Sequence, residues 1–302
     1  MTTFFHGTGF GLDFRCKQKL SELSYTPSAP ASHDLIDINW ESPTAHSATV
    51  SDISSGLHQV SADDYLLGIR DVGHYRITPT TITVLPMADA HEDAVRLFLF
   101  GSALGALLHL RGILPLHASA IRLPNDKAVV FCGVSTAGKS TLTAALTQHG
   151  YSCLADDIAA IHFDNHGKAW LYPGLPRMKL WSHALQSLDL EGEQRVRPGI
   201  DKYFVNHDIH NSCQPVPLHH FYELGVHEEC DVRLTPITGM AKISALLSNT
   251  YRPAFIDKFG RQSLHMERIA KLAPQLAMKQ ICRPAHKPTL KQIIDLLEKD
   301  WE

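Results

Sequence analysis

Gly133–Ser140, which reads G-V-S-T-A-G-K-S, matches the phosphate-loop pattern G-x-x-x-x-G-K-[ST]. The two glycines let consecutive backbone N–H groups turn toward phosphate oxygens. Lys139 supplies a positive charge for the terminal phosphates, and the Ser140 hydroxyl can ligate Mg²⁺. The pattern predicts a site for ATP, or another nucleoside triphosphate, together with Mg²⁺. The residues expected to bind the nucleotide are Gly133, Ser135, Thr136, Ala137, Gly138, Lys139, Ser140 and Thr141.

Asp156 and Asp157 are the second group of candidate catalytic or metal-binding residues. A helix of about 10 residues after the loop descends about 15 Å. The expected strand Tyr151–Ala155 then rises about 16 Å, so the chain returns to the level of the phosphates at the two carboxylates. One carboxylate would take a proton from an attacking hydroxyl, and the other would hold Mg²⁺ directly or through water. We slightly favour Asp156 as base and assign Asp157, with Ser140, to the metal; the alternative is a solvent-exposed turn.

His117 is the third candidate, within the expected strand 114–122. A tight-turn sequence joins this strand to the next one, 127–132, which predicts an antiparallel hairpin. Continuing the pairing from the turn places His117 opposite Gly133, at the mouth of the phosphate loop. There it would pair with a catalytic carboxylate or with phosphate; the alternative is a core histidine satisfied by the backbone. Ser119 is expected to serve packing.

The elements around the loop indicate the fold class. Lys127–Cys132 is a short apolar strand, and Thr141–His149 reads as a helix that ends at Gly150, so the order is strand, loop, helix. In common phosphate-loop folds the loop strand lies among parallel neighbours. An antiparallel strand that leads directly into it therefore argues against a GTPase or ATPase sheet and favours an α/β fold with a mixed sheet.

The region before residue 90 has no helical periodicity, and Tyr75–Leu85 reads as a strand pair that turns near Pro79. We therefore expect a small β-rich N-terminal domain over residues 1–90 and a second domain over 91–302. The second domain would begin with a helix over His91–Arg111, ended by Gly112. Further expected elements are strands Leu218–Leu224 and Arg233–Ile237, and helices Ala241–Leu247, Leu264–Leu276 (interrupted at Pro274) and Pro288–Trp301.

The composition excludes several function classes. With 302 residues, 44% hydrophobic and 20% charged, and a net charge of −3, the chain gives no electrostatic basis for binding nucleic acid or a membrane. Leu97–Leu110 is short for a bilayer span and is flanked by arginines, so a buried helix is expected. No signal peptide is expected, and six cysteines without C-x-x-C pairing favour reduced thiols in a cytoplasmic protein.

The run L-H-A-S-A at 116–120, the phosphate loop and L-A-D-D at 154–157 together resemble the HPr kinase/phosphorylase family. The resemblance implies an α/β fold shared with phosphoenolpyruvate carboxykinase, with a phosphate-loop core. It implies that Lys139 and Ser140 bind phosphate and Mg²⁺, that one of the two aspartates is the base, and that His117 supports it. Segments 173–181, 217–218 and 249–253 are similar to a subgroup that includes kinases of lasso peptide precursors.

The sequence departs from HPr kinases after the acid pair. Where that family carries a Glu and an Arg-Gly turn, this chain has P-R-M-K-L-W at 176–181. The difference argues against HPr as substrate and against the reverse phosphorolysis. Arg177, Lys179 and Lys202 would contact phosphates or an acidic part of a substrate, or be solvated surface charges.

The resulting expectation is a cytoplasmic kinase that uses ATP or another nucleoside triphosphate with Mg²⁺. Its acceptor would be a Ser hydroxyl of a peptide or small protein, and homo-oligomerisation is left open. Two alternatives remain: a kinase for small-molecule hydroxyls on the same fold, and a non-catalytic nucleotide-binding sensor.

Overall fold

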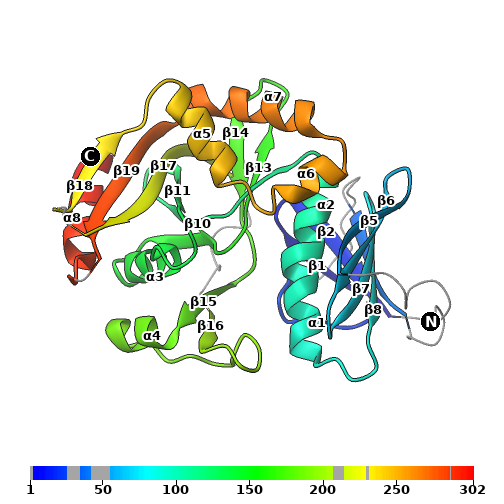
Figure 1. Cartoon of the computed structure of the whole chain (residues 1–302). Helices are drawn as coiled ribbons and strands as arrows, with labels where there is room; N and C mark the ends of the chain where they lie inside the picture. The colour runs from blue at the N-terminus through cyan, green and yellow to red at the C-terminus, as the bar shows by residue number, and fades with distance from the viewer. Residues whose placement is uncertain (1–2, 26–34, 42–54, 207–213, 229–230, 286) are drawn as a thin grey trace.

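The N-terminal region forms an eight-stranded sheet in the computed structural model, which describes residues 3–25, 35–41, 55–206, 214–228, 231–285 and 287–302 (Figure 1). The strand order is β3-β1-β2-β4-β8-β7-β6-β5. Buried and partly exposed residues alternate along β2 and β4, as expected when one face of a sheet covers a core. The strands are β1 (Phe5–Gly9), β2 (Leu12–Cys16), β3 (Ser24–Tyr25), β4 (Leu35–Trp40), β5 (Gly56–Ser61), β6 (Asp64–Ile69), β7 (Gly73–Thr78) and β8 (Thr81–Pro86).

The hairpin of β7 and β8 confirms the strand pair predicted within 75–85. Ile77 lies opposite Ile82, and the turn occupies residues 79 and 80. Tyr75, Ile77, Ile82 and Val84 are almost fully buried, because alternate side chains of both strands face the same core. The sequence pattern therefore located both strands and the turn between them.

One long helical segment covers this sheet (Figure 1). It consists of α1 (Glu92–Phe98), a π-helical stretch Leu99–Ala103 and α2 (Leu104–Leu110), and it ends at Gly112, whose φ is +67°. The segment is long and apolar enough to cross a membrane by length and composition alone, but 78% of its most apolar window is buried inside the protein. The expectation of a buried helix is confirmed, and its side chains share one hydrophobic core with the N-terminal sheet.

A nine-stranded mixed sheet carries the candidate site. Its main path runs β12-β10-β11-β17-β14-β13-β9, with β19 paired to β17 and β18 paired to β19. The pairs β11–β17 and β17–β19 are parallel, whereas β10–β11 is antiparallel. The mixed α/β architecture expected from the sequence is therefore present. The strands are β9 (Leu114–Leu116), β10 (Ser119–Arg122), β11 (Ala128–Cys132), β12 (Ser152–Ala155), β13 (Ala159–Phe163), β14 (Ala169–Tyr172), β17 (Val216–His227), β18 (Arg233–Pro236) and β19 (Ala277–Pro284).

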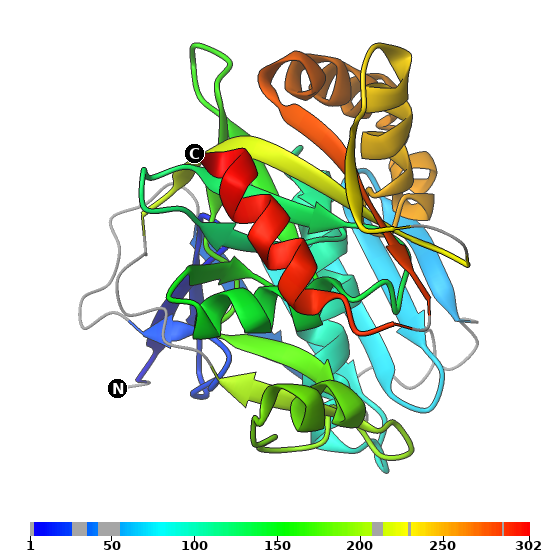
Figure 2. The same ribbon diagram turned by 90° about the vertical axis from the view of Figure 1, so that its left-hand side faces the viewer.

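Helices cover both faces of this sheet. On one face, α3 (Lys139–Gln148), α4 (Ser182–Leu188) and α8 (Leu290–Trp301) share a hydrophobic cluster with the strands. On the other face, α5 (Met240–Ser248) and α7 (Gln262–Leu272) share a second cluster. Figure 2 shows α8 crossing the sheet beside α3. The remaining elements are α6 (Ala254–Lys258), a 3₁₀ turn Ala273–Gln275 and the separate pair β15 (Arg177–Trp181) and β16 (Lys202–Asn206).

The predicted single strand over 114–122 is wrong in one respect. The structure has two strands there, because the chain breaks at residues 117 and 118 and the two halves pair with different neighbours. β9 pairs with β13, and β10 pairs with β11 and β12. The predicted hairpin register is confirmed, since Ser119 lies opposite Phe131 and Arg122 opposite Ala128.

The predicted elements after residue 210 are confirmed with shifted ends. β17 is longer than expected on both sides, and α5, α7 and α8 lie where helical periodicity placed them. Pro274 occurs in the 3₁₀ turn that follows α7, so the interruption expected there is also observed.

Candidate active site

The phosphate-loop segment connects β11 to α3. Gly133 has a φ of +132°, and a Cβ there would lie 2.7 Å from the Leu224 carbonyl oxygen. Gly138 has a φ of +103° and immediately precedes α3. Both positions require a residue without a side chain, because the backbone is in the left-handed region and, at Gly133, also touches β17. The strand–loop–helix order predicted by the motif is therefore present.

Lys139 bends back across the loop that precedes it. Its ammonium donates to the carbonyls of Gly133 (2.9 Å) and Val134 (3.3 Å) and lies 3.2 Å from His117 Nε2. The side chain is 7% exposed, and burial lowers its pKa. Of the other loop residues, Ser135 and Thr136 are exposed and Ala137 is buried. Gly138, Ser140 and Thr141 are partly exposed.

Asp156 lies beside Ser140, just past the end of β12. Its Oδ1 atom accepts hydrogen bonds from Ser140 Oγ and Ser119 Oγ, both at 2.7 Å, and its Oδ2 accepts one from the Lys179 backbone N–H at 2.9 Å. The expectation that the acid pair returns to the level of the loop is thus confirmed. Ser119, expected only to pack, is fully buried and helps to fix this carboxylate.

Asp157 turns the other way and forms a chain of charged contacts. It has a φ of +75°, an uncommon conformation that Asp tolerates better than most residues. Lys179 Nζ donates to Oδ2 at 2.9 Å, and His117 Nδ1 lies 3.4 Å from Oδ1. Burial acts to raise the pKa of Asp157, but the positive charge and the hydrogen bond of Lys179 outweigh it and hold that pKa well below its usual range.

His117 occupies the break between β9 and β10 and links the loop to the acid pair. Its Nδ1 lies 3.1 Å from the Asp157 carbonyl oxygen, and its backbone N–H donates to the Asn249 carbonyl at 2.7 Å. Burial, and then the charge of Lys139, lower its pKa. A neutral ring protonated at Nδ1 fits these contacts, because it donates toward Asp157 and accepts from Lys139. The structure therefore brings together all three predicted catalytic side chains.

Asn249 was missed as a site residue. Its side-chain Oδ1 accepts from the Gly133 backbone N–H at 2.8 Å, and its Nδ2 donates to Glu223 Oε1 at 2.8 Å. With its backbone carbonyl on His117, this buried amide fixes both the start of the loop and the histidine. The sequence signal for Asn249 is the block N-T-Y-R-P at 249–253, which by itself supports only the family resemblance.

Arg283, at the end of β19, is a second residue that sequence reasoning missed. Its Nη2 donates to the Ala137 carbonyl at 3.2 Å. β11, β17 and β19 run parallel, so their carboxyl ends meet at one edge of the sheet and bring Arg283 beside the loop. No local pattern marks this arginine, because 146 positions separate the two bonded residues.

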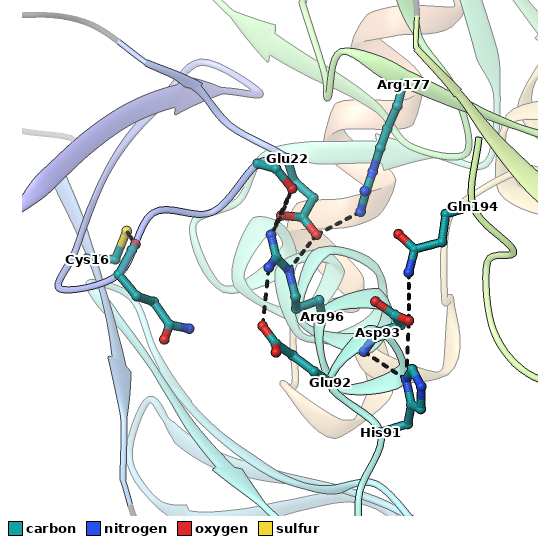
Figure 3. Close-up of polar contacts among 10 residues, drawn as sticks. Cys16, Glu22, His91, Glu92, Asp93, Arg96, Arg177 and Gln194 are labelled. Atoms are coloured by element: carbon teal, nitrogen blue, oxygen red, sulfur yellow. Dashed lines mark hydrogen bonds and ion pairs between the residues drawn. The ribbon is translucent and has the colours of Figure 1, made fainter.

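The three basic residues left open by the sequence have different surroundings. Arg177 donates to Glu22 at 2.9 Å and lies over the Phe204 ring, so it is not a solvated surface charge. Figure 3 shows Glu22 between Arg177 and Arg96, which also donates to it at 2.9 Å. Lys179 pairs with Asp157, as described above. Lys202 lies near the Trp181 ring.

A small, partly open pocket adjoins the acid pair. Both carboxylates line it, together with apolar side chains from the N-terminal sheet and from the long helix. The lining residues are Phe10, Leu97, Phe100, Asp156, Asp157, Ile158, Leu175, Arg177 and Lys179. The aspartates thus border both the phosphate loop, through Ser140, and this pocket.

Comparisons with known proteins give little beyond this geometry. No protein-family model matches the chain, and no curated protein matches it. Among solved structures, it is similar to the HPr(Ser) kinase/phosphatase from Coxiella burnetii, at 15% identity over 62% of this chain and 94% of that one, with a TM-score of 0.29. A likeness this low carries no functional conclusion.

Proposed function

We propose that this protein transfers the γ-phosphoryl group of ATP, or of another nucleoside triphosphate, to a hydroxyl group. One observation carries the proposal: the hydroxyl of Ser140 and the ammonium of Lys139 each contact a side chain of the His117, Asp156 and Asp157 cluster. Phosphoryl transfer needs a phosphate cradle, a metal-binding oxygen and a carboxylate near the incoming hydroxyl, and these contacts unite the side chains suited to those roles.

The donor set fits Mg²⁺. Ser140 Oγ and Asp156 Oδ1 are hard oxygen ligands 2.7 Å apart. Within the described residues no group of three or more His, Cys, Asp or Glu side chains could hold a metal ion. Mg²⁺ bound with a nucleotide usually takes one or two protein ligands and completes its shell with phosphate oxygens and water. When bound, it would neutralise charge on the phosphates.

These contacts support a different division of roles between the aspartates from the one favoured by sequence. Asp156 shares hydrogen bonds with Ser140, so we propose it as the metal partner. Asp157, oriented by His117 and Lys179 and bordering the pocket, would then be the base. Its lowered pKa keeps it ionised at neutral pH, so it can accept a proton as the hydroxyl becomes more acidic in the transition state.

The proposed step is balanced as follows. The acceptor oxygen forms a bond to the γ-phosphorus, and the bond from that phosphorus to the bridging oxygen breaks. The electron pair of the broken bond stays on the departing nucleoside diphosphate, while the proton of the hydroxyl moves to Asp157. His117 and Lys179 hold the carboxylate in position, and Lys139 offsets negative charge on the transferred group.

For the acceptor, we propose a Ser hydroxyl of a peptide or small protein, following the resemblance to kinases of peptide precursors. A small-molecule hydroxyl is the second candidate for the same chemistry. A non-catalytic sensor is disfavoured, because nucleotide binding alone does not need Asp157 beside the loop. We also propose a cytoplasmic location. The thiols of Cys16, Cys132 and Cys153 are free and buried, and Cys282 is also buried, whereas Cys213 and Cys230 lie outside the described residues.

The test is phosphoryl transfer from γ-labelled ATP with Mg²⁺ to a library of Ser-containing peptides, with each peptide matched by a Ser→Ala copy. We expect label on Ser peptides and none on the Ala copies. Label on metabolites alone would support the small-molecule kinase. Tight nucleotide binding without transfer to peptides, metabolites or water would contradict the proposal and indicate a sensor.

A further inference from the structure

The turn between β1 and β2 inserts a buried aromatic side chain next to the acid pair. Phe10 is 2% exposed and has a φ of +60°. Its backbone N–H donates to the Pro173 carbonyl at 2.7 Å, and its carbonyl accepts from His162 Nε2 at 2.8 Å. The turn of the N-terminal sheet is therefore fastened to the nine-stranded sheet on both sides.

The conformation of Phe10 is unusual for its type. A bulky residue at positive φ is uncommon and persists only where its surroundings hold it, and such residues cluster at functional sites. A Cβ at Gly174 would lie 3.1 Å from the Phe10 ring, and the Gly174 backbone N–H donates to Leu154, two residues before Asp156. The ring thus lies against the segment that carries the carboxylates.

The pocket beside the acid pair is built by two parts of the chain. Phe10 comes from the N-terminal sheet, Leu97 and Phe100 from the long helix, and Leu175 from the segment before β15. The two aspartates line the same pocket as these apolar side chains. A hydroxyl that enters the pocket would therefore meet the carboxylates with apolar groups around it.

Both cations of the lining are already paired. Lys179 contacts Asp157, and Arg177 contacts Glu22, which is 2% exposed and also held by Arg96 (Figure 3). Since these pairs are internal, neither cation is free to neutralise an acidic group of a ligand. A carboxylate placed next to Asp156 and Asp157 would lose water and meet two like charges.

Resting on the proposed phosphoryl transfer, we propose that this pocket binds the acceptor, and that the acceptor hydroxyl has an uncharged, apolar neighbour. For a peptide acceptor, this means a Ser next to an aliphatic residue rather than next to Asp or Glu. The N-terminal sheet acts in this selection through Phe10, which forms one wall of the pocket.

The experiment uses two acetylated and amidated peptides that contain one Ser flanked by Leu or by Asp and are otherwise identical. Binding is measured by calorimetry and transfer by label from γ-labelled ATP. We expect kcat/KM to be at least about tenfold higher for the Leu peptide, the order expected when an apolar side chain is buried. Binding should show the same preference.

Variants of the lining residues test whether the preference for the Leu peptide arises in the pocket. Leu175→Ala and Phe10→Leu should reduce it to within about threefold by removing apolar contact. Leu190→Ala changes a half-buried leucine outside the lining and should leave it unchanged. Nucleotide affinity is measured on each variant to verify that the phosphate loop is folded. If Phe10→Leu does not fold, Leu175→Ala still tests the pocket.

The outcomes separate the two proposals. If phosphoryl transfer shows no preference for the Leu peptide, or favours the Asp peptide, the assignment of the pocket to the acceptor is overturned. The same holds if the preference for the Leu peptide survives in Leu175→Ala. In both cases the kinase assignment stays intact. A Leu preference in binding without any transfer contradicts the kinase assignment and supports the pocket. Failure of both peptides to bind overturns the pocket.

Discussion

At the residue scale, His117 connects the phosphate loop to the proposed base, with Lys139 on one side and Asp157 on the other. Its ring lies beside the proposed base and the phosphate loop, so it should affect the transition state more than nucleotide binding. We expect His117→Ala to lower kcat by about 10- to 1000-fold, the range for removing one supporting polar group. Nucleotide affinity should change much less.

The matched variant is His117→Asn, whose side-chain amide can replace the Nδ1 donor toward Asp157. It should retain more turnover than His117→Ala. Melting temperature and kcat are to be measured on the same preparation of each variant. A destabilised His117→Ala protein that keeps full specific activity would make this residue structural.

At the element scale, the helix that covers the N-terminal sheet meets Tyr251 from the segment after α5. A Cβ at Gly105 would lie 2.7 Å from the Tyr251 ring, whereas one at Gly101 would lie 3.4 Å from its hydroxyl. Gly105→Ala must displace the ring, so we expect a loss of about 1–3 kcal/mol in the free energy of unfolding. Gly101→Ala should be close to neutral, and denaturant unfolding of both variants compares the two sites.

Tyr251 also matters for the site, because its ring lies 5.9 Å from that of His117 and its neighbour Asn249 holds the loop. Gly105→Ala should therefore reduce turnover as well as stability. Equal stability of the two alanine variants would show that Tyr251 moves aside without cost.

Local pattern predicted the phosphate loop, the hairpin register and the position of the acid pair, because each depends on residues close together in sequence. The break between β9 and β10 was missed, since it arises from pairing with β13, a partner that local pattern does not reveal. Contacts over long separations were also missed. Asn249 reaches Gly133 across 116 positions, and Arg177 reaches Glu22 across 155. Such pairs arise from tertiary packing, which brings together residues that are far apart in sequence.

At the scale of the whole molecule, pH should affect stability through buried histidines, of which His109 is the clearest. It is 6% exposed, and its Nε2 donates to the Tyr251 carbonyl at 2.8 Å. Burial lowers the pKa of His109 to about 4, from an ordinary value near 6.5. The unfolded chain therefore binds this proton more readily, and stability should fall as pH falls from 6.5 to 4.

The size of this effect is about 3 kcal/mol, since each pKa unit corresponds to about 1.4 kcal/mol. His109→Gln keeps a donor near the Tyr251 carbonyl but cannot ionise. The difference between wild type and this variant in unfolding free energy, measured across that pH range, isolates the contribution of His109. Parallel pH curves for the two proteins would exclude it as a buried neutral histidine.

Phe10 joins the N-terminal sheet to the segment after β14 of the nine-stranded sheet, and Glu22 links the N-terminal region to Arg96 in α1 and Arg177 in β15. Because the two parts of the chain meet here, the lining of the pocket includes residues from both. The acid pair thus lies between the phosphate loop and the acceptor pocket. In the proposed reaction, Asp157 takes the acceptor proton there.

Single-turnover phosphoryl transfer from γ-labelled ATP to a Ser peptide tests this role of Asp157. The rate is measured for Asp157→Asn and, as the comparison, for Asp156→Asn, each at several Mg²⁺ concentrations. We predict that Asp157→Asn binds nucleotide and Mg²⁺ normally but transfers about 100-fold or more slowly. Asp156→Asn should instead raise the Mg²⁺ concentration needed for transfer. Transfer by Asp157→Asn at a rate near that of the wild type would contradict the account.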